Sequence, residues 1–360
     1  MVAPRGDGRR TKAGINPVCL RCDRSFGAEA CDRYKRRVRQ WSDDSDLGDA
    51  PLPNNENPFR ASSARGDAIA PIIALGTIET ELAGGQDEAR RTVGGTATHF
   101  GLSARYLAPV ELLGTVGADF GLDDFAVLAQ RGVITSGIRR PAAVTVAART
   151  SHGRELTAAA ADEDSLAARI AHRSTQRPSA IYLAGVSPAE QLELVQQDPD
   201  TDILAIDIGR DWNDARRSDI MTAIRSAEVV FLNSWHARLL TGVSQFVGAA
   251  RYLQELGAGV VVLRHAEYGA SAFVGSHVIK LPSFPLMECI DPAGAGASFA
   301  GGFLGAVAWR GSLDRASIMI AMLCGTVLAS FTVERFGVDR ILELSRGDLA
   351  DRYDELLAII

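Results

Sequence analysis

Lysine is nearly absent from this chain. Among 38 basic residues only three are lysines, Lys12, Lys35 and Lys280. A P-loop, which binds nucleotide phosphates, needs a lysine directly after its glycines. None of the three lysines follows such a loop, so the P-loop class of proteins is excluded. With a net charge of −6, the chain must attract anionic ligands locally, through arginine or backbone dipoles.

Cysteine is also scarce, with five residues in 360. Cys19, Cys22 and Cys31 lie close together near the N-terminus, but a zinc site normally needs four ligands. No histidine of that segment supplies the fourth, because the first histidine of the chain is His99. We therefore predict no metal site and reduced thiols, as in a cytoplasmic protein, with zinc binding by these three cysteines as the alternative.

Long apolar runs are lacking too. The longest uncharged run, residues 317–333, is short for a membrane span and is interrupted by Ser and Thr, so we expect a buried core helix. The N-terminus has no apolar stretch of the kind found in secretory signals. The acidic net charge argues against a nucleic-acid-binding protein. These features predict a cytoplasmic protein that binds neither a membrane nor a nucleic acid.

The chain changes character near residue 69. Residues 1–66 hold 13 lysines and arginines against 9 acidic residues and show no sustained apolar periodicity. Such a composition is typical of disorder. We therefore predict a disordered or loosely structured N-terminal extension over residues 1–68 and one folded domain over residues 69–360.

Short apolar runs alternate with helical patterns from residue 71 onward. Runs that end in Gly or Asn are typical of buried parallel strands. The alternation predicts an α/β fold, with a mostly parallel sheet covered by helices on both faces. Such folds bind ligands where the carboxyl ends of strands turn into helices. The predicted strands are residues 71–76, 110–117, 180–185, 202–209, 228–233 and 259–264, and the predicted helices are residues 96–107, 188–197, 214–226 and 246–256.

A glycine-rich turn, Gly294, Ala295 and Gly296, runs directly into a helix of small residues. A dinucleotide-binding fingerprint needs a third glycine where Phe299 stands, so a dinucleotide-dependent oxidoreductase is a poor candidate. Backbone N–H groups at a helix N-terminus can still bind an anion. The alternative is a tight turn whose small residues allow close packing of the helix on the sheet.

Residues 291–302, DPAGAGASFAGG, resemble the second signature of the PfkB family of carbohydrate kinases, D-[TP]-[TA]-G-A-G-D-x-F-x-x-G. Further segments follow in the family's order. They are VGGTATHFGLSARYL (93–107), VVFLNSWHARLLTG (229–242), VVVLRHAEYGASAF (260–273) and AMLCGTVLASFTVERFG (321–337). The resemblance covers residues 71–358. It implies a ribokinase-like fold, in which a mostly parallel sheet is flanked by helices and carries a small β lid, here predicted to be reduced.

The resemblance also implies an activity, transfer of the γ-phosphoryl group of ATP with Mg²⁺ to a hydroxyl of a sugar or nucleoside. Gly294, Ala295 and Gly296 would form the anion hole for the transferred group. Homodimers that form through the lid are frequent in the family. The residues implied to lie at the nucleotide are Asn233, Gly269 and Gly325, and those implied to border the substrate are Gly94, Gly95 and Thr96.

Three positions depart from the family pattern. Ala297 stands where the family has the aspartate that takes the hydroxyl proton, and His236 stands where it has a glutamate that helps organise Mg²⁺. The family's sugar-binding aspartate is also missing, and only Glu79 and Glu81 lie nearby. We therefore hold two hypotheses, a kinase with a weakened site and an inactive pseudokinase that binds nucleotide or sugar as a sensor or partner.

Other side chains near the predicted site have ordinary interpretations. We expect Asp291 to brace the glycine turn, and Asp207 to point to the same sheet edge, where it is the alternative proton acceptor. A surface position on its helix is the expectation for His99, with a substrate contact as the alternative. We expect a solvated Arg264, with a phosphate contact as the alternative, and a surface or core His236, with a ligand role as the alternative. Trp235 and Trp309 are expected to have packing roles.

Overall fold

A computed structural model describes residues 56–61, 69–83, 90–117, 120–140, 148–150, 153–155, 170, 177–197, 199–209 and 216–360. The predictions for residues 1–55, including the zinc alternative at Cys19, Cys22 and Cys31, lie outside these residues.

A nine-stranded sheet forms the centre of the molecule, with the order β13-β12-β11-β10-β9-β8-β1-β4-β5. All neighbouring pairs from β11 to β5 are parallel. The pairs β11–β12 and β12–β13 are antiparallel. The prediction of a mostly parallel sheet is confirmed. The strands are β1 Ile72–Leu75, β4 Val110–Thr115, β5 Ile134–Arg139, β8 Ala180–Ala184, β9 Leu204–Ile208, β10 Val229–Asn233, β11 Val260–Arg264, β12 Ala270–Val274 and β13 His277–Leu281.

A second, smaller sheet has the order β3-β2-β6-β7. Its strands are three to five residues long: β2 Glu79–Ala83, β3 Arg90–Gly94, β6 Ala148–Thr150 and β7 Gly153–Glu155. The expected β lid is therefore present as four short strands, built from two segments far apart in the sequence.

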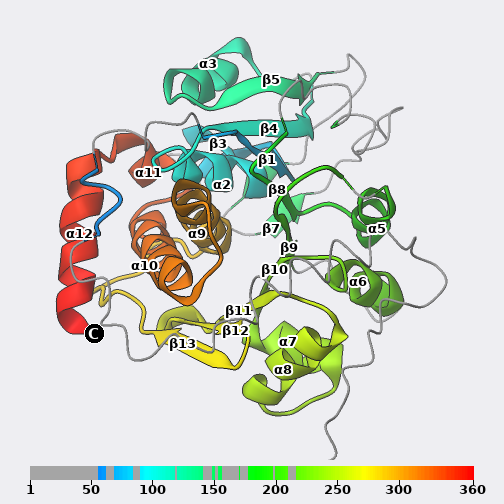
Figure 1. Cartoon of the computed structure of the whole chain (residues 1–360). Helices are drawn as coiled ribbons and strands as arrows, with labels where there is room; N and C mark the ends of the chain where they lie inside the picture. The colour runs from blue at the N-terminus through cyan, green and yellow to red at the C-terminus, as the bar shows by residue number, and fades with distance from the viewer. Residues whose placement is uncertain are drawn as a thin grey trace, which may run out of the picture.

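Helices cover both faces of the central sheet (Figure 1). One face lies against α2 Thr96–Ala104, α9 Ala295–Arg310 and α10 Arg315–Thr332, with α12 Arg346–Ile359 outside them. The other lies against α5 Pro188–Gln196, α6 Arg217–Ile224, α7 Ser234–Thr241 and α8 Phe246–Leu256. The described chain also contains α3 Leu122–Gln130, the short η3 Ala266–Tyr268 and α11 Asp339–Glu343.

Helices α9 and α10 pack closely at their glycines. A β-carbon at Gly302 would lie 2.6 Å from the Cys324 carbonyl oxygen, and one at Gly325 would lie 2.8 Å from that of Phe299. Because α10 is long and apolar it passes the length and composition test for a membrane span, but 78% of it is buried inside the protein. This burial confirms the expected core helix.

Residues 56–61, which fall inside the predicted N-terminal extension, lie against α12. Asn57 Nδ2 donates to the Ala350 carbonyl oxygen over 2.9 Å, and the buried Phe59 meets the Tyr353 ring edge-on. Arg60 adds exposed ion pairs to Asp351 and Asp354. This short segment therefore belongs to the packed body of the protein.

Candidate active site at the head of helix α9

The glycine turn ends at the start of α9, at the carboxyl edge of the central sheet. Gly294 is the N-cap and has a φ of 78°, in the left-handed region that favours glycine. A β-carbon at this position would also overlap the imidazole ring of His99, which lies on α2. Both the turn and the packing thus require glycine. Gly294 has no capping side chain, and Ala295 N donates to the Pro292 carbonyl oxygen over 3.4 Å. The N–H groups of Gly296 and Ala297 therefore remain available to an anion.

Ala297 lies in this first turn and is buried, with 7% of its surface exposed. Its methyl group can neither accept nor donate a proton. Ser298 N donates to the Gly294 carbonyl oxygen over 2.9 Å, so the helix is regular from its first residues. The position where the resemblance implies a base is therefore well ordered and lacks a titratable group.

Asp291 braces the turn, as expected from the sequence. Its Oδ1 accepts from Ala293 N at 2.9 Å, and its Oδ2 accepts from Gly337 N at 3.4 Å. The backbone N–H of Ile290 donates to Val333 O over 2.8 Å. The glycine turn is thus fixed to the loop that follows α10, residues 333–338.

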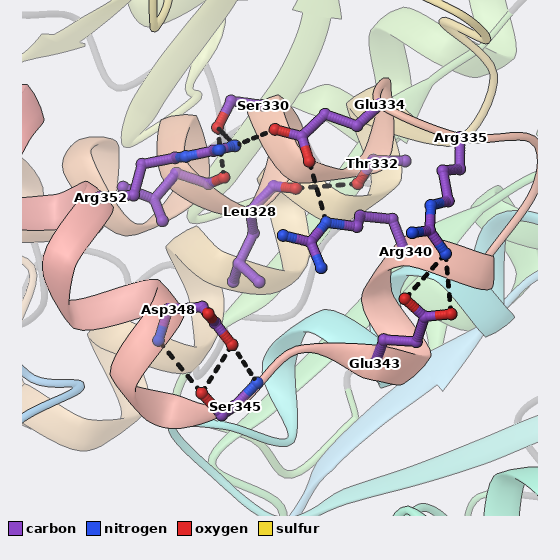
Figure 2. Close-up of polar contacts among 11 residues, drawn as sticks. Leu328, Ser330, Thr332, Glu334, Arg335, Arg340, Glu343, Ser345, Asp348 and Arg352 are labelled. Carbon is purple, nitrogen blue, oxygen red and sulfur yellow. Dashed lines mark hydrogen bonds and ion pairs between the residues drawn. The ribbon is translucent and has the colours of Figure 1, made fainter.

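That loop is itself held by a cluster of charged side chains (Figure 2). The Glu334 carboxylate lies between two arginines, 2.9 Å from Arg340 Nε and 2.6 Å from Arg352 Nη1. The guanidinium carbon of Arg352 also lies 3.4 Å from the centre of the Phe331 ring. These contacts connect α10, α11 and α12 and support the loop that Asp291 contacts.

Arg264 is not solvated, and the prediction for it is wrong. From the end of β11 it makes a two-pronged ion pair with Asp207 on β9, with Nη2–Oδ1 at 2.5 Å and Nη1–Oδ2 at 2.8 Å. The side chains are only 18% and 8% exposed, respectively. Nη1 of Arg264 also donates to the Gly296 carbonyl oxygen over 2.9 Å, so the arginine reaches the glycine turn.

The electrostatics of this pair follow from its burial. Burial lowers the pKa of Arg264, but the charge and hydrogen bonds of Asp207 outweigh it and raise the pKa above its usual value. Tyr182 donates its hydroxyl to Asp207 Oδ2 over 2.9 Å, and burial followed by the charge of Asp207 raises the pKa of that hydroxyl. Since both oxygens of Asp207 already accept charge-assisted hydrogen bonds, this carboxylate is poorly suited to be the alternative base.

A cavity of about 520 Å³ opens beside Arg264, over the ends of β10 and β11. Arg238 of α7 and Lys280 of β13 also line it, and Glu267 is the acidic residue of its lining. His265 lies in the same wall, and burial together with the charges of Lys280 and Arg238 lowers its pKa. The cavity is therefore electropositive and suited to an anionic ligand.

Two exposed aromatic side chains border this cavity, Trp235 at 63% and Tyr268 at 72% exposed. The predicted packing role of Trp235 is wrong, because its exposed side chain stands near the start of α7 and lines the cavity instead. Trp309, by contrast, is buried as expected, with 9% exposed. Aromatic rings at the mouth of an electropositive cavity suit a ligand with a flat ring and an anionic part.

The predicted substrate segment lies on the other side of the glycine turn. A side chain at Gly94 would overlap the buried Glu81, and one at Gly95, with a φ of 93°, would overlap the Thr77 carbonyl oxygen. Thr96 Oγ1 donates to the Ala184 carbonyl oxygen over 3.1 Å, which joins this segment to β8. The helix that follows carries His99, which is buried at 1% exposure against Gly294, so the expected surface position is wrong.

Comparison with known proteins identifies the family. The model of the pfkB family carbohydrate kinase matches residues 66–343. The chain belongs to this family. The matched range includes residues 291–302, which resemble the second pfkB signature, and the reading of Ala297 as the replaced base stays a prediction.

Individual relatives span sugar and nucleoside kinases. The cytidine kinase of Thermococcus kodakarensis is 33% identical over 128 residues, which are 34% of this chain and 45% of that protein. The ATP-dependent ribose-1-phosphate kinase of Halopiger xanaduensis is 27% identical over 256 residues, 67% of this chain and 81% of that protein. The chain thus matches less than half the length of the cytidine kinase.

Among solved structures, a fructokinase from Vibrio cholerae O395 in a fructose-, ADP- and calcium-bound form has a TM-score of 0.68. It is 17% identical, and the superposition covers 79% of this chain and 99% of that one. The pfkB chain described here therefore has the ribokinase-like fold that its sequence predicts.

The three positions that the resemblance places at the nucleotide have different surroundings. Asn233 lines the cavity, but its Oδ1 accepts from His236 N at 2.7 Å and so caps α7. Gly269 ends the η3 turn next to the cavity wall, with a φ of 92°. Gly325 fills the close contact of α10 with Phe299, so a packing role accounts for this glycine and its nucleotide contact stays a prediction.

Magnesium fits this site only together with the nucleotide. Within the described part of the chain, no group of three or more His, Cys, Asp or Glu side chains could hold a metal ion. Kinase Mg²⁺ is usually held by one or two carboxylates, phosphates and water. Asp207 is occupied by Arg264 and Tyr182, and the resemblance implies that His236 stands in place of a glutamate. The phosphates of the nucleotide would therefore be the main ligands, with Glu267 as the nearby carboxylate.

Proposed function

We propose that this pfkB chain binds ATP and a sugar or nucleoside, and that it positions an acceptor hydroxyl against the γ-phosphate at the head of α9. The observation that supports this proposal is the position of the glycine turn between the electropositive cavity and the predicted substrate segment. Gly294 packs on His99, which follows the substrate segment, and Gly296 contacts Arg264, which lines the electropositive cavity. A phosphoryl group moving from one region to the other would pass the N–H groups of this turn.

The chemistry needs little more than position and charge. Phosphoryl transfer depends mainly on alignment and on stabilisation of the transferring group, and preorganised N–H donors supply much of that stabilisation. A positioned base adds about 10²- to 10⁴-fold in rate. Because Ala297 has no proton acceptor and Asp207 is held by Arg264, we expect this chain to bind its substrates well and to turn them over slowly.

The second candidate function is that of an inactive relative, which binds nucleotide or sugar as a sensor or partner. The same Ala297 favours it, because loss of the base affects turnover and leaves the glycine turn, the cavity and the substrate segment in place. The two functions predict equal binding and differ only in residual turnover.

The test compares the parent chain with Ala297→Asp, using Ala297→Asn as a control of nearly the same size that lacks a base. ATP affinity is measured by calorimetry, and turnover by ADP release with Mg²⁺ and a panel of sugars and nucleosides. We expect all three chains to bind ATP and only the Asp variant to gain about 10²-fold or more in turnover. Equal turnover by the Asp and Asn variants would refute the missing-base explanation, and no ATP binding by the parent would refute the proposed function.

A further inference from the structure

The ion pair between Arg264 and Asp207 crosses a strand of the central sheet. Asp207 lies on β9 and Arg264 on β11, with β10 between them. Neighbouring strands lie about 4.8 Å apart, so the two side chains together bridge about 10 Å. On the intervening strand β10, Asp207 is opposite Phe231 and Arg264 is opposite Asn233. Because these two positions of β10 are two residues apart, the side chains of Asp207 and Arg264 point to the same face of the sheet, the face that α9 covers.

The guanidinium group retains hydrogen-bonding capacity at this point. Arginine has five N–H donors. Nη1 donates to Asp207 and to Gly296, and Nη2 donates to Asp207, which uses three donors among the described residues. The N–H of Nε and one N–H of Nη2 are left over, on a side chain that lines the cavity and is 18% exposed.

The surrounding charge favours an anion at those donors. Arg238 and Lys280 line the same cavity, and Glu267 is the acidic residue of its lining. Lys280 is one of only three lysines in the chain, and it lines this cavity. The ion pair with Asp207 fixes the plane of the guanidinium group, which lets its remaining donors meet a phosphate in one orientation.

We propose that Arg264 contacts the terminal phosphates of the bound nucleoside triphosphate beside Gly296, and that Asp207 is the positioning residue that orients it. The contact rests on the proposed function, because it requires that the nucleotide occupy the cavity. Arg264 then supplies fixed positive charge next to the N–H groups of α9, in a site that lacks the family's metal-organising glutamate.

The test compares the affinities of the whole chain for ATP and AMP by calorimetry. Arg264→Met should weaken ATP binding by about 10- to 100-fold, because charge-assisted hydrogen bonds to the phosphates are lost, and change AMP binding by less than about threefold. Asp207→Asn keeps the arginine but loses the ion pair that orients it. Removal of the negative charge offsets part of this loss, so ATP binding should weaken by a smaller factor than in Arg264→Met, with the same selectivity. Arg251→Met removes an equal charge from α8, where Arg251 bonds to Gly275 and Ser276, and should change neither affinity.

The outcomes separate the two proposals. If the parent binds neither ATP nor AMP, the proposed function fails. If the parent binds ATP and Arg264→Met binds it equally well, or loses ATP and AMP affinity by the same factor, the role of Arg264 is overturned. If circular dichroism shows that Arg264→Met does not fold, Arg264→Lys tests the proposal instead, because it keeps the charge but loses the two-pronged geometry. An unchanged ratio of ATP to AMP affinity in Arg264→Lys refutes the proposal.

Discussion

Replacement of Gly294 by alanine should be one of the costliest single-methyl changes in this protein. The φ of 78° is disfavoured for alanine by about 1–2 kcal/mol. The new methyl group would also overlap the ring of His99, which is buried with 1% of its surface exposed. Overpacking of a filled site costs about 1–3 kcal/mol. We therefore expect Gly294→Ala to lower the free energy of unfolding by about 2–5 kcal/mol, measured by urea denaturation.

Gly311, at the other end of α9, provides a matched control. Its φ is 71°, but nothing lies within 4 Å of a β-carbon there, so Gly311→Ala should cost only the backbone part, about 1–2 kcal/mol. In a double-mutant cycle, His99→Ala should recover about 1–3 kcal/mol in the Gly294→Ala background. If Gly294→Ala costs no more than Gly311→Ala, or if the cycle shows no coupling, the contact between His99 and the glycine turn is not as described.

Two further predictions concern charged groups. Glu334→Gln should lower the free energy of unfolding by about 1–3 kcal/mol, because Arg340 and Arg352 lose a half-buried charged partner. Glu343→Gln affects an exposed ion pair with Arg335 and should cost less than about 1 kcal/mol. Equal losses for the two variants in urea denaturation would contradict this prediction. The lowered pKa of His265 means that the folded protein binds fewer protons than the unfolded chain. The stability of the protein should therefore fall as the pH drops below about 6.5, and it should fall less in His265→Gln. Thermal denaturation between pH 7 and pH 5 measures this difference.

The strands and the central helices could be predicted because their signal is local. Each predicted strand is a short apolar run buried on both faces of the sheet, and β10, predicted as residues 228–233, is observed at Val229–Asn233. Helix α8 was predicted over residues 246–256 and has those bounds. The glycine turn was also located correctly at the start of α9, because its glycines are adjacent in the sequence.

The contacts that build the site join residues that are far apart in the chain. Arg264 and Asp207 are 57 residues apart, and His99 meets a glycine nearly 200 residues further along. An arginine that ends a strand is most often solvated, and a histidine on a helix is most often exposed, so both predictions followed the common case. Strand parity was an available signal, because Asp207 and Arg264 project from the same face once the order β9-β10-β11 is known. That order is a property of the fold, and single segments do not contain it.

Under the proposed function, Ala297 and Arg264 act in opposite directions on the two halves of the reaction. Ala297 has no carboxylate to take a proton from the acceptor, so we expect it to weaken the chemical step. Arg264 places a fixed positive charge beside the same helix turn, so it strengthens the hold on an anion. Its own countercharge comes from Asp207, on the far side of β10, and leaves the cavity electropositive. The proposal therefore assigns substrate binding and proton removal to different residues, and it predicts that binding persists where proton removal is lost.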